Sequence, residues 1–292
     1  MSAEPTKTGT APEVSDRPEN AGAVLLRRDS NGIATLTLNR PKQYNALSTG
    51  LMSALQAMLE RLGDDRSVKA VIIEGAGKGF CAGHDLKEMN AGREAGNGAD
   101  AGRAYFQSVF EQCSRMMLSI TRLPQPVIAK VQGIATAAGC QLVATCDLAV
   151  AADSAYFATP GVNIGLFCST PMVALTRAVP RKTAMEMLLT GEGIDAATAE
   201  RIGLINRAVP ADELDLAAME FAEKIAGKSP LTLKTGKEAF YRQIEMDMEQ
   251  AYSYASQVMT TNMLARDAQE GISAFIEKRD PVWRDEKLAP NK

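Results

Sequence analysis

Residues 69–86, KAVIIEGAGKGFCAGHDL, decide the fold class of this 292-residue chain. The apolar run at 69–74 has the length of a buried strand, and a glycine-rich turn follows it before a short helical pattern. Short apolar runs recur at 126–131 and 147–152, with helical patterns between them. Because parallel strands need long crossover connections, this alternation predicts an α/β core.

The segments on either side of this core have clear local signals. Upstream, two strand-like runs at 24–28 and 33–39 flank Asn31-Gly32, a pair typical of a β-hairpin turn, and a helix is predicted from Ser48 to Gly63. Downstream, amphipathic patterns cover 212–226, 231–242 and 247–278, with a break near Arg266. We therefore predict a disordered tail over 1–22, an α/β core over 23–211 and a helical C-terminal region over 212–292.

Composition excludes several classes of function. The formal net charge of −3 gives no electrostatic footprint for nucleic acid or for an anionic membrane. No apolar run reaches the roughly 20 residues of a membrane span, and residues 1–22 lack the apolar segment of a signal peptide. The five cysteines are odd in number and show no C-x-x-C spacing, which argues against a disulfide framework or a zinc site and favours a reducing cytoplasm.

Two glycine-rich turns are the candidate sites of chemistry. The first, 75–86, lacks the glycine that a dinucleotide fingerprint requires at Phe80, so a Rossmann site is disfavoured. Free N–H groups at such a turn could instead bind developing negative charge, although the glycines could also serve only to make a tight turn. The second turn, within 131–142 (VQGIATAAGCQL), has the same pattern or could reflect close helix packing. A loop predicted over 92–102 could cover such a site.

Several ordered motifs carry a resemblance to a known family. They are NRPK at 39–42, NAL at 45–47, FCAGHDLKEM at 80–89, the segment 133–147, FATP at 157–160 and the ending 270–279. Over residues 23 to 284 the chain resembles the crotonase (enoyl-CoA hydratase/isomerase) superfamily, and within it most closely the enoyl-CoA hydratase domain-containing proteins.

The resemblance implies a spiral of ββα repeats, C-terminal helices that build a homotrimer or a dimer of trimers, and an acyl-CoA thioester as the bound molecule, with no cofactor beyond its CoA moiety. It implies an oxyanion hole formed by the main-chain N–H groups of His84 and Ala138, where Ala138 replaces the usual glycine. The residues implied to contact CoA are Lys42, Asn45, Ala46, Leu47, Ala82, Gly83, His84, Asp85, Phe275 and Lys278.

The chain departs from the family pattern where hydratases carry two glutamates. These positions correspond to Gln141 and Gly161, neither of which can exchange a proton near neutral pH. A malonyl-type decarboxylase, which forms its enolate by loss of CO₂, and a non-catalytic acyl-CoA-binding protein are therefore kept as alternatives. A side-chain role for His84, the single histidine, and nucleophilic roles for Cys140 and Cys168 are weaker possibilities.

Overall fold

The computed structural model describes residues 22–94 and 101–284. Nearly all of the predicted N-terminal tail therefore lies outside the described residues, as does most of the loop predicted over 92–102. Within that loop, the described ends are helical, because α2 (Leu86–Glu94) and α3 (Ala101–Arg122) extend into it from both sides.

The main sheet has the strand order β1-β2-β3-β4-β6-β9. Its first two strands, β1 (Leu25–Ser30) and β2 (Ile33–Leu38), form the predicted antiparallel hairpin. Asn31 and Gly32 form its turn with φ values of 51° and 77°, a conformation that asparagine and glycine tolerate best. The other strands of the sheet run parallel to β2: β3 (Ala70–Gly75), β4 (Val127–Val131), β6 (Leu148–Ala152) and β9 (Arg207–Val209).

Side chains that alternate along the strands fill two separate cores. On β3, Val71 and Ile73 face the main core, whereas Ala70 and Ile72 face a smaller cluster with helix α8 (Leu214–Ala226). This alternation explains why each strand reads as a continuous apolar run, since both faces of the sheet are covered.

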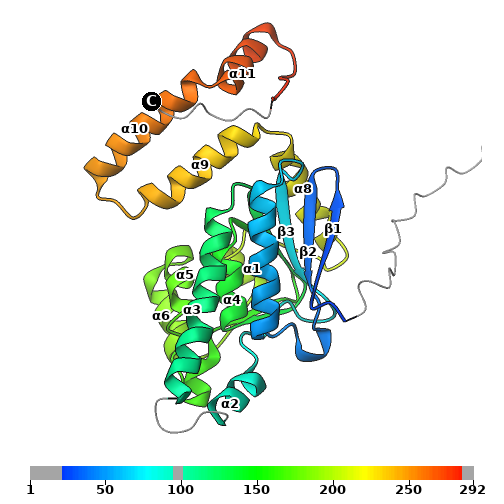
Figure 1. Cartoon of the computed structure of the whole chain (residues 1–292), viewed down its shortest axis with the longest axis vertical. Helices are drawn as coiled ribbons and strands as arrows, with labels where there is room; N and C mark the ends of the chain where they lie inside the picture. Colours follow the sequence, from blue (N-terminus) through cyan, green and yellow to red (C-terminus); the bar gives the residue numbers. More distant parts are fainter. Residues whose placement is uncertain (1–21, 95–100, 285–292) are drawn as a thin grey trace, which may run out of the picture.

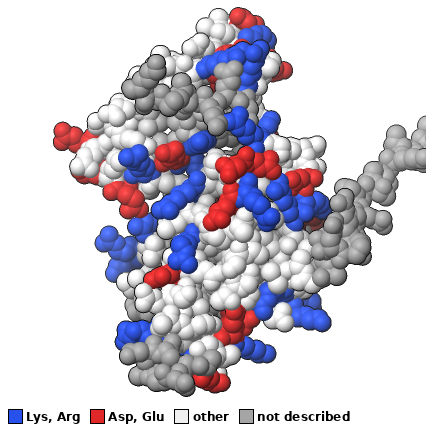
Figure 2. Space-filling model, in the orientation of Figure 1, with Lys and Arg blue, Asp and Glu red and all other residues white. Residues whose placement is uncertain are grey.

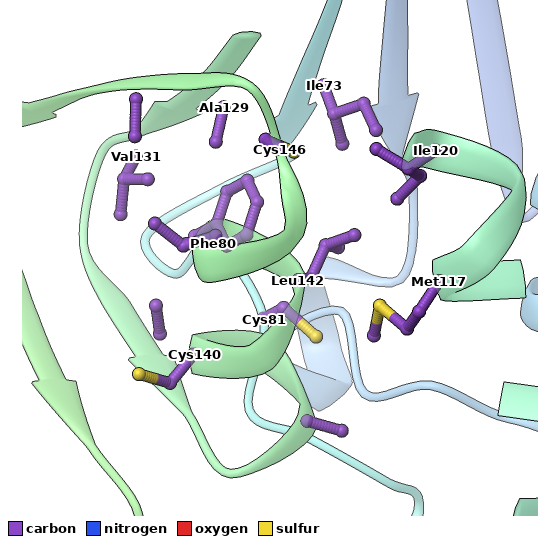
Figure 3. Packing of buried hydrophobic residues seen from close by; sticks show 14 of the residues in the cluster. Ile73, Phe80, Cys81, Met117, Ile120, Ala129, Val131, Cys140, Leu142 and Cys146 are labelled. Atoms are coloured by element: carbon purple, nitrogen blue, oxygen red, sulfur yellow. The ribbon is translucent and has the colours of Figure 1, made fainter. Parts of the chain in front are cut away.

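Helices α1 (Thr49–Asp64), α3 and α4 (Ala138–Thr145) pack over the main core (Figure 1). The predicted N-cap of α1 is present, because the Ser48 hydroxyl accepts a hydrogen bond from the Leu51 N–H at 3.1 Å. Figure 3 shows Phe80 and Cys81 among the core residues beside Leu142 of α4. These two fully buried side chains fix the first glycine-rich turn to the sheet and to α4.

Besides β6, the chain between β4 and β9 forms a second, smaller sheet that we did not predict. A three-stranded sheet contains β5 (Ile134–Thr136), β7 (Tyr156–Ala158) and β8 (Ile194–Asp195). Its strands are too short for periodicity to identify. The short helices around it are η3 (Pro160–Ile164), α5 (Pro171–Ala178), α6 (Arg181–Thr190) and α7 (Ala196–Ile202), and a further short helix, η2 (Pro41–Gln43), follows β2.

The C-terminal region is helical, as predicted, with α9 (Pro230–Gln243), α10 (Met248–Leu264) and α11 (Arg266–Glu277). The predicted break near Arg266 separates α10 from α11. Figure 1 shows these helices extending away from the sheet. The mixed α/β fold with a helical C-terminal region is therefore confirmed.

A buried ion pair anchors this helical region to the core. The Lys237 ammonium of α9 donates to Asp147 at 2.6 Å and to the carbonyls of Ile120 and Gln125 at 2.9 and 3.0 Å. The Tyr241 hydroxyl also donates to Asp147 at 2.8 Å. All three lysine donors are thus used, which is how a buried ammonium escapes the full cost of desolvation.

Charges of both signs are interspersed on the face of the molecule drawn in Figure 2. None of the helices in the described ranges combines the length and apolarity that a membrane span requires.

Candidate functional site

Asn45 holds the first glycine-rich turn in place. Its side chain is fully buried, accepts from the Arg40 N–H at 2.9 Å and donates to the carbonyls of Ala76 and Gly79 at 3.0 and 2.8 Å. These bonds tie the turn after β3 to the loop that carries Asn45. They use both the oxygen and the nitrogen of the Asn45 amide. The resemblance implied that Asn45 contacts CoA, but its side chain has a structural role.

The main chain at His84 lies beside Leu47 in an isolated parallel bridge. The Leu47 N–H donates to the Gly83 carbonyl at 2.7 Å, and the Asp85 N–H donates to the Leu47 carbonyl at 3.2 Å. In a parallel bridge of this kind the flanking peptides make the bonds, and the central N–H points to the opposite side. The His84 N–H accordingly has no hydrogen-bond acceptor among residues 22–94 and 101–284.

Asp85 secures the segment that follows. It pairs with Arg40 at 2.8 Å, and its carboxylate accepts from the N–H groups of Lys87 and Glu88 at 3.2 Å each, at the start of α2. Burial alone would raise the pKa of Asp85, but the Arg40 guanidinium and the Glu88 and Lys87 N–H groups outweigh it and lower the pKa. Asp85 therefore stays ionised and fixes the direction in which the chain leaves His84.

The second turn contains a strained residue. Ala137, which precedes α4, has φ 50° and ψ −117°, a conformation that favours glycine, and no side chain caps the helix. Its ψ angle sets the plane of the peptide that carries the Ala138 N–H. Ala138 is the first residue of α4 and is not among the residues with positive φ, so its N–H is one of the helix donors that lack an intrahelical acceptor.

Glycines bring the two turns into contact. A Cβ atom added at Gly83 would lie 2.9 Å from the Ala137 Cβ and 3.3 Å from the Ala138 nitrogen. A Cβ atom added at Gly139 would lie 2.0 Å from the Cys81 carbonyl oxygen. No side chain fits at either position, and the absence of one lets the segments around residues 84 and 138 lie side by side.

The His84 ring is half-buried and lies against Phe110 of α3, edge to face, with the ring centroids 5.6 Å apart. Both ring nitrogens are buried; neither forms a well-aligned hydrogen bond in the described chain, but the Leu47 carbonyl lies close enough to act on the ring. Burial lowers the pKa of His84, an effect that the Leu47 carbonyl and the Glu88 carboxylate oppose only in part. The imidazole is therefore neutral at pH 7, with one donor and one acceptor.

Gln141 and Thr159 place further polar groups beside the second turn. Gln141 lies on the first turn of α4, is 5% exposed, and its side-chain oxygen has no partner in the described chain. The Thr159 hydroxyl is likewise buried and unpartnered. Sequence reasoning did not single out Thr159, because a threonine before Pro-Gly reads only as a turn residue.

Gly161 has no room for a side chain. An added Cβ atom would lie 2.7 Å from the Leu166 carbonyl oxygen and 2.9 Å from the Cys168 sulfur. The segment 166–168 therefore occupies the space into which a side chain at residue 161 would project.

The cysteines are poor nucleophiles. Burial raises the pKa of Cys140 to about 12 and also raises that of Cys168. The possible nucleophilic roles of Cys140 and Cys168 are thus disfavoured, because the apolar surroundings outweigh the field of a nearby helix end.

The remaining residues implied as CoA contacts are divided between two regions. Ala46, Leu47, Ala82 and Gly83 lie beside His84, and Lys42 is exposed on η2 in the same loop. Phe275 and Lys278 lie at the end of α11, in the helical region that extends away from the sheet (Figure 1), and Phe275 is 85% exposed. The fold therefore does not bring these two groups together within one chain.

Comparisons with known proteins identify the family to which this chain is similar. A family model described as enoyl-CoA hydratase/isomerase matches residues 28–286. The chain is 47% identical over 266 residues to the rat enoyl-CoA hydratase domain-containing protein 3, mitochondrial, covering 91% of this chain and 86% of the relative. It is 36% identical over 261 residues to a probable enoyl-CoA hydratase of Mycobacterium tuberculosis, covering 89% and 97% of the two chains.

Solved structures with the same fold include an enoyl-CoA hydratase from Mycobacterium smegmatis, at 51% identity and a TM-score of 0.84, covering 89% of this chain and 99% of that one. Human enoyl coenzyme A hydratase domain-containing protein 3 is similar at 48% identity and the same TM-score of 0.84, covering 89% and 100%.

These relatives overturn the predicted location. The rat, mouse, human and frog relatives, at 46–47% identity, are all named as mitochondrial proteins, so the prediction of a cytoplasmic location is wrong. Unpaired cysteines indicate a reducing environment but do not distinguish one reducing compartment from another.

Proposed function

The chain belongs to the enoyl-CoA hydratase/isomerase family, and from that premise we propose that the main-chain N–H groups of His84 and Ala138 bind the thioester oxygen of an acyl-CoA. The observation that carries this proposal is the contact between the two turns at Gly83 and Gly139. Two unused N–H groups on adjacent segments are suited to bind one oxygen atom, and they bind it more strongly once it becomes the oxyanion of an enolate. The protein would thus process acyl-CoA thioesters through an enolate.

The chemistry that follows the enolate differs from two-carboxylate hydration. Gln141 and Gly161 stand where the family resemblance expects glutamates, and neither an amide nor a glycine can take up or deliver a proton at neutral pH. Each missing general acid or base would lower the rate by about 10² to 10⁴. A hydratase or isomerase of this kind would need another proton-transfer group, and slow hydration of simple enoyl thioesters is expected.

Decarboxylation of a malonyl-type thioester is the second candidate reaction, favoured by the same two residues. Loss of CO₂ generates the enolate directly from the breaking C–C bond, so the enzyme has no α-proton to remove. A binding protein without turnover is the remaining alternative. A panel of 2-enoyl, 3-enoyl and malonyl-type thioesters, followed by mass spectrometry, separates these possibilities, and absence of turnover for all of them would leave binding alone.

The oxyanion hole can be tested before the reaction is known. Acetoacetyl-CoA ionises to an enolate that absorbs in the ultraviolet, so a pair of N–H donors at its thioester oxygen should increase the enolate fraction when protein is added. A thioether analogue that lacks the thioester carbonyl should show no such increase. If both compounds bind without any change in the enolate spectrum, the proposal is refuted.

Gly83→Ala is the variant that tests the geometry, because the new methyl group would push the Ala137 and Ala138 turn away from His84. Losing one donor costs about 2.7–4 kcal/mol, so the enolate fraction should fall by roughly 100-fold or more. Gly203→Ala is the matched control: its φ of 85° imposes similar backbone strain, but its nearest neighbour, the Ala178 carbonyl, is 3.7 Å away. The control should keep the wild-type spectrum.

Gln141→Glu tests whether the scaffold can regain hydration chemistry. This variant restores a carboxylate on α4 at a position that already has a long side chain. Gly161→Glu is a poorer choice, because its Cβ atom would displace the Leu166 carbonyl. We expect Gln141→Glu to raise the rate of crotonyl-CoA hydration by about 10²-fold or more, since one acid–base group contributes about 10² to 10⁴.

The predicted homotrimer or dimer of trimers remains part of this proposal. Large apolar side chains are exposed on α10 and α11, including Tyr252 at 70%, Leu264 at 74% and Ile276 at 73%. Their burial against another copy would remove apolar surface that monomeric proteins rarely expose. Association could also bring Phe275 and Lys278 of one copy to the CoA site of another.

A further inference from the structure

The side chain of Gln132 binds the main chain of the first glycine-rich turn. Gln132 itself lies in the second glycine-rich turn, directly after the last residue of β4. Its amide nitrogen donates to the carbonyls of Gly75 at 2.6 Å, Gly77 at 3.2 Å and Gly79 at 2.8 Å. Three carbonyls of one turn therefore converge on one side chain of the other turn. Gln132 thus joins the two segments that carry the proposed N–H donors.

Asn45 holds the first turn from another direction. Asn45 and Gln132 both donate to the Gly79 carbonyl, at 2.8 Å each. The bonds of Asn45 tie the first turn to the loop after β2, whereas those of Gln132 tie it to the second turn. The two turns are in direct contact here, because a Cβ atom added at Gly133 would lie 2.1 Å from the Lys78 carbonyl oxygen. Gln132 provides side-chain hydrogen bonds at this contact.

The main chain extends the contact toward the two proposed donors. The Cys81 N–H donates to the Ile134 carbonyl at 3.1 Å, and the Thr136 N–H donates to the Cys81 carbonyl at 2.9 Å. These bonds lie three residues before His84 on one segment and two residues before Ala138 on the other. A shift of the first turn relative to the second is therefore expected to change the spacing between the His84 and Ala138 N–H groups.

We propose that Gln132 is a positioning residue for the oxyanion hole, which sets the spacing between the His84 and Ala138 N–H groups. This inference rests on the proposed function, because it assumes that both groups bind one thioester oxygen. Fixed donors stabilise an oxyanion only where they are correctly placed, and a displacement of about 1 Å can lower the rate by about 100-fold. The amide nitrogen of Gln132 is used by the three carbonyls, so Gln132 acts through the main chain.

Gln125 provides a matched control at the other end of β4. Its amide nitrogen also donates to three carbonyls, those of Leu62 at 2.7 Å, Asp65 at 3.2 Å and Val68 at 3.3 Å. These carbonyls belong to the end of α1 and the connection that precedes β3, whereas Gln132 binds the turn that follows β3. The side-chain oxygens of both glutamines are buried without a partner in the described chain. Loss of the Gln125 amide therefore removes an equivalent set of bonds far from the two glycine-rich turns.

The test compares Gln132→Met with Gln125→Met, since methionine is similar in length to glutamine and has no N–H donor. Both variants should melt at a lower temperature than wild type, Gln125→Met at least as much because Gln125 is buried. Below these melting temperatures, the enolate fraction of bound acetoacetyl-CoA should fall about tenfold in Gln132→Met and stay unchanged in Gln125→Met. The affinity of both variants for the thioether analogue should remain that of wild type.

An unchanged enolate fraction in Gln132→Met would refute the positioning role. So would an equal loss in both variants, because the effect would then follow stability and not the position of the bonds. Absence of any enolate with wild type would instead refute the proposed oxyanion hole, on which this role depends.

Gln132→Asn provides the test if Gln132→Met does not fold. Asparagine keeps the amide but is one methylene group shorter, so it cannot reach all three carbonyls without movement of the turn. The variant should lower the enolate fraction and keep the affinity for the thioether analogue. A wild-type enolate fraction in Gln132→Asn would refute the positioning role.

Discussion

Replacing Ala137 by glycine should stabilise the protein, whereas the same change one residue later should destabilise it. Ala137 has φ 50° and ψ −117°, a region that costs a residue with a Cβ atom about 1–3 kcal/mol. Glycine removes that strain but adds about 0.4–1 kcal/mol of chain entropy to the unfolded state. The difference predicts a gain of about 1 kcal/mol for Ala137→Gly.

Substitution of the adjacent residue, Ala138, by glycine should have the opposite effect on stability. It lies within α4 without positive φ, and its methyl group is fully buried. Ala138→Gly therefore loses the transfer free energy of one methyl group, about 0.8 kcal/mol, together with part of the glycine penalty in a helix, about 1 kcal/mol. No strain is released to offset these losses.

Thermal and urea unfolding of the two variants, at one protein concentration, measure the difference. A change of 1 kcal/mol shifts the melting temperature of a chain of this size by about 2–4 °C, so the variants should move in opposite directions by amounts that are easily resolved. If Ala137→Gly lowers the melting temperature as much as Ala138→Gly does, Ala137 is not strained and the reasoning about the second turn fails. If the strain also orients the Ala138 N–H, the more stable Ala137→Gly variant should ionise acetoacetyl-CoA less well than wild type.

Three further predictions concern the C-terminal region. Lys237→Met should lower the free energy of unfolding by about 3–5 kcal/mol in urea titrations, because Asp147 would lose its buried partner, and a loss below 1 kcal/mol would contradict this. Glu270 has its pKa lowered to about 2, first by the Arg279 hydrogen bond, so its contribution is present above its unfolded value near 4.5 and is lost as the pH falls toward 2. Glu270 also accepts from the Val282 N–H at 2.8 Å, and the adjacent Trp283, the single tryptophan of the chain, donates to the Gly227 carbonyl at 2.8 Å. Glu270→Gln should therefore reproduce at pH 7 the red shift of Trp283 fluorescence expected on acidification, and an unchanged spectrum in both cases would show that Glu270 does not hold residues 282–283 in place. Light scattering should give a mass of at least three chains for wild type and a smaller mass for Phe275→Glu, whereas a monomeric wild type would refute the proposed association.

Elements with strong local signals could be predicted from the sequence. Asn31-Gly32 predicted the hairpin, and Ser48 predicted the start of α1, because turn and cap preferences depend on a few adjacent residues. The same holds for the break near Arg266. The strands of the second sheet were missed because two or three residues carry no readable period.

For the candidate site, too, some features could be predicted from the sequence and others only from the structure. His84, Ala138, Gln141 and Gly161 could be named from the sequence because they stand in motifs shared with a family. Their surroundings could not, since burial and hydrogen bonding depend on segments far apart in the chain. The bonds of Asn45 to the turn after β3 and the unpartnered hydroxyl of Thr159 are examples.

The sequence by itself determined the α/β order of elements, the helical C-terminal region and the two glycine-rich turns, because periodicity and turn chemistry are properties of neighbouring residues. Only the tertiary structure decided that Gly83 lies against Ala137, that Ala137 takes a positive φ, and that Leu166 fills the space beside Gly161. These features arise from contacts between segments many residues apart, and close packing permits them only where the missing side chain of a glycine leaves room.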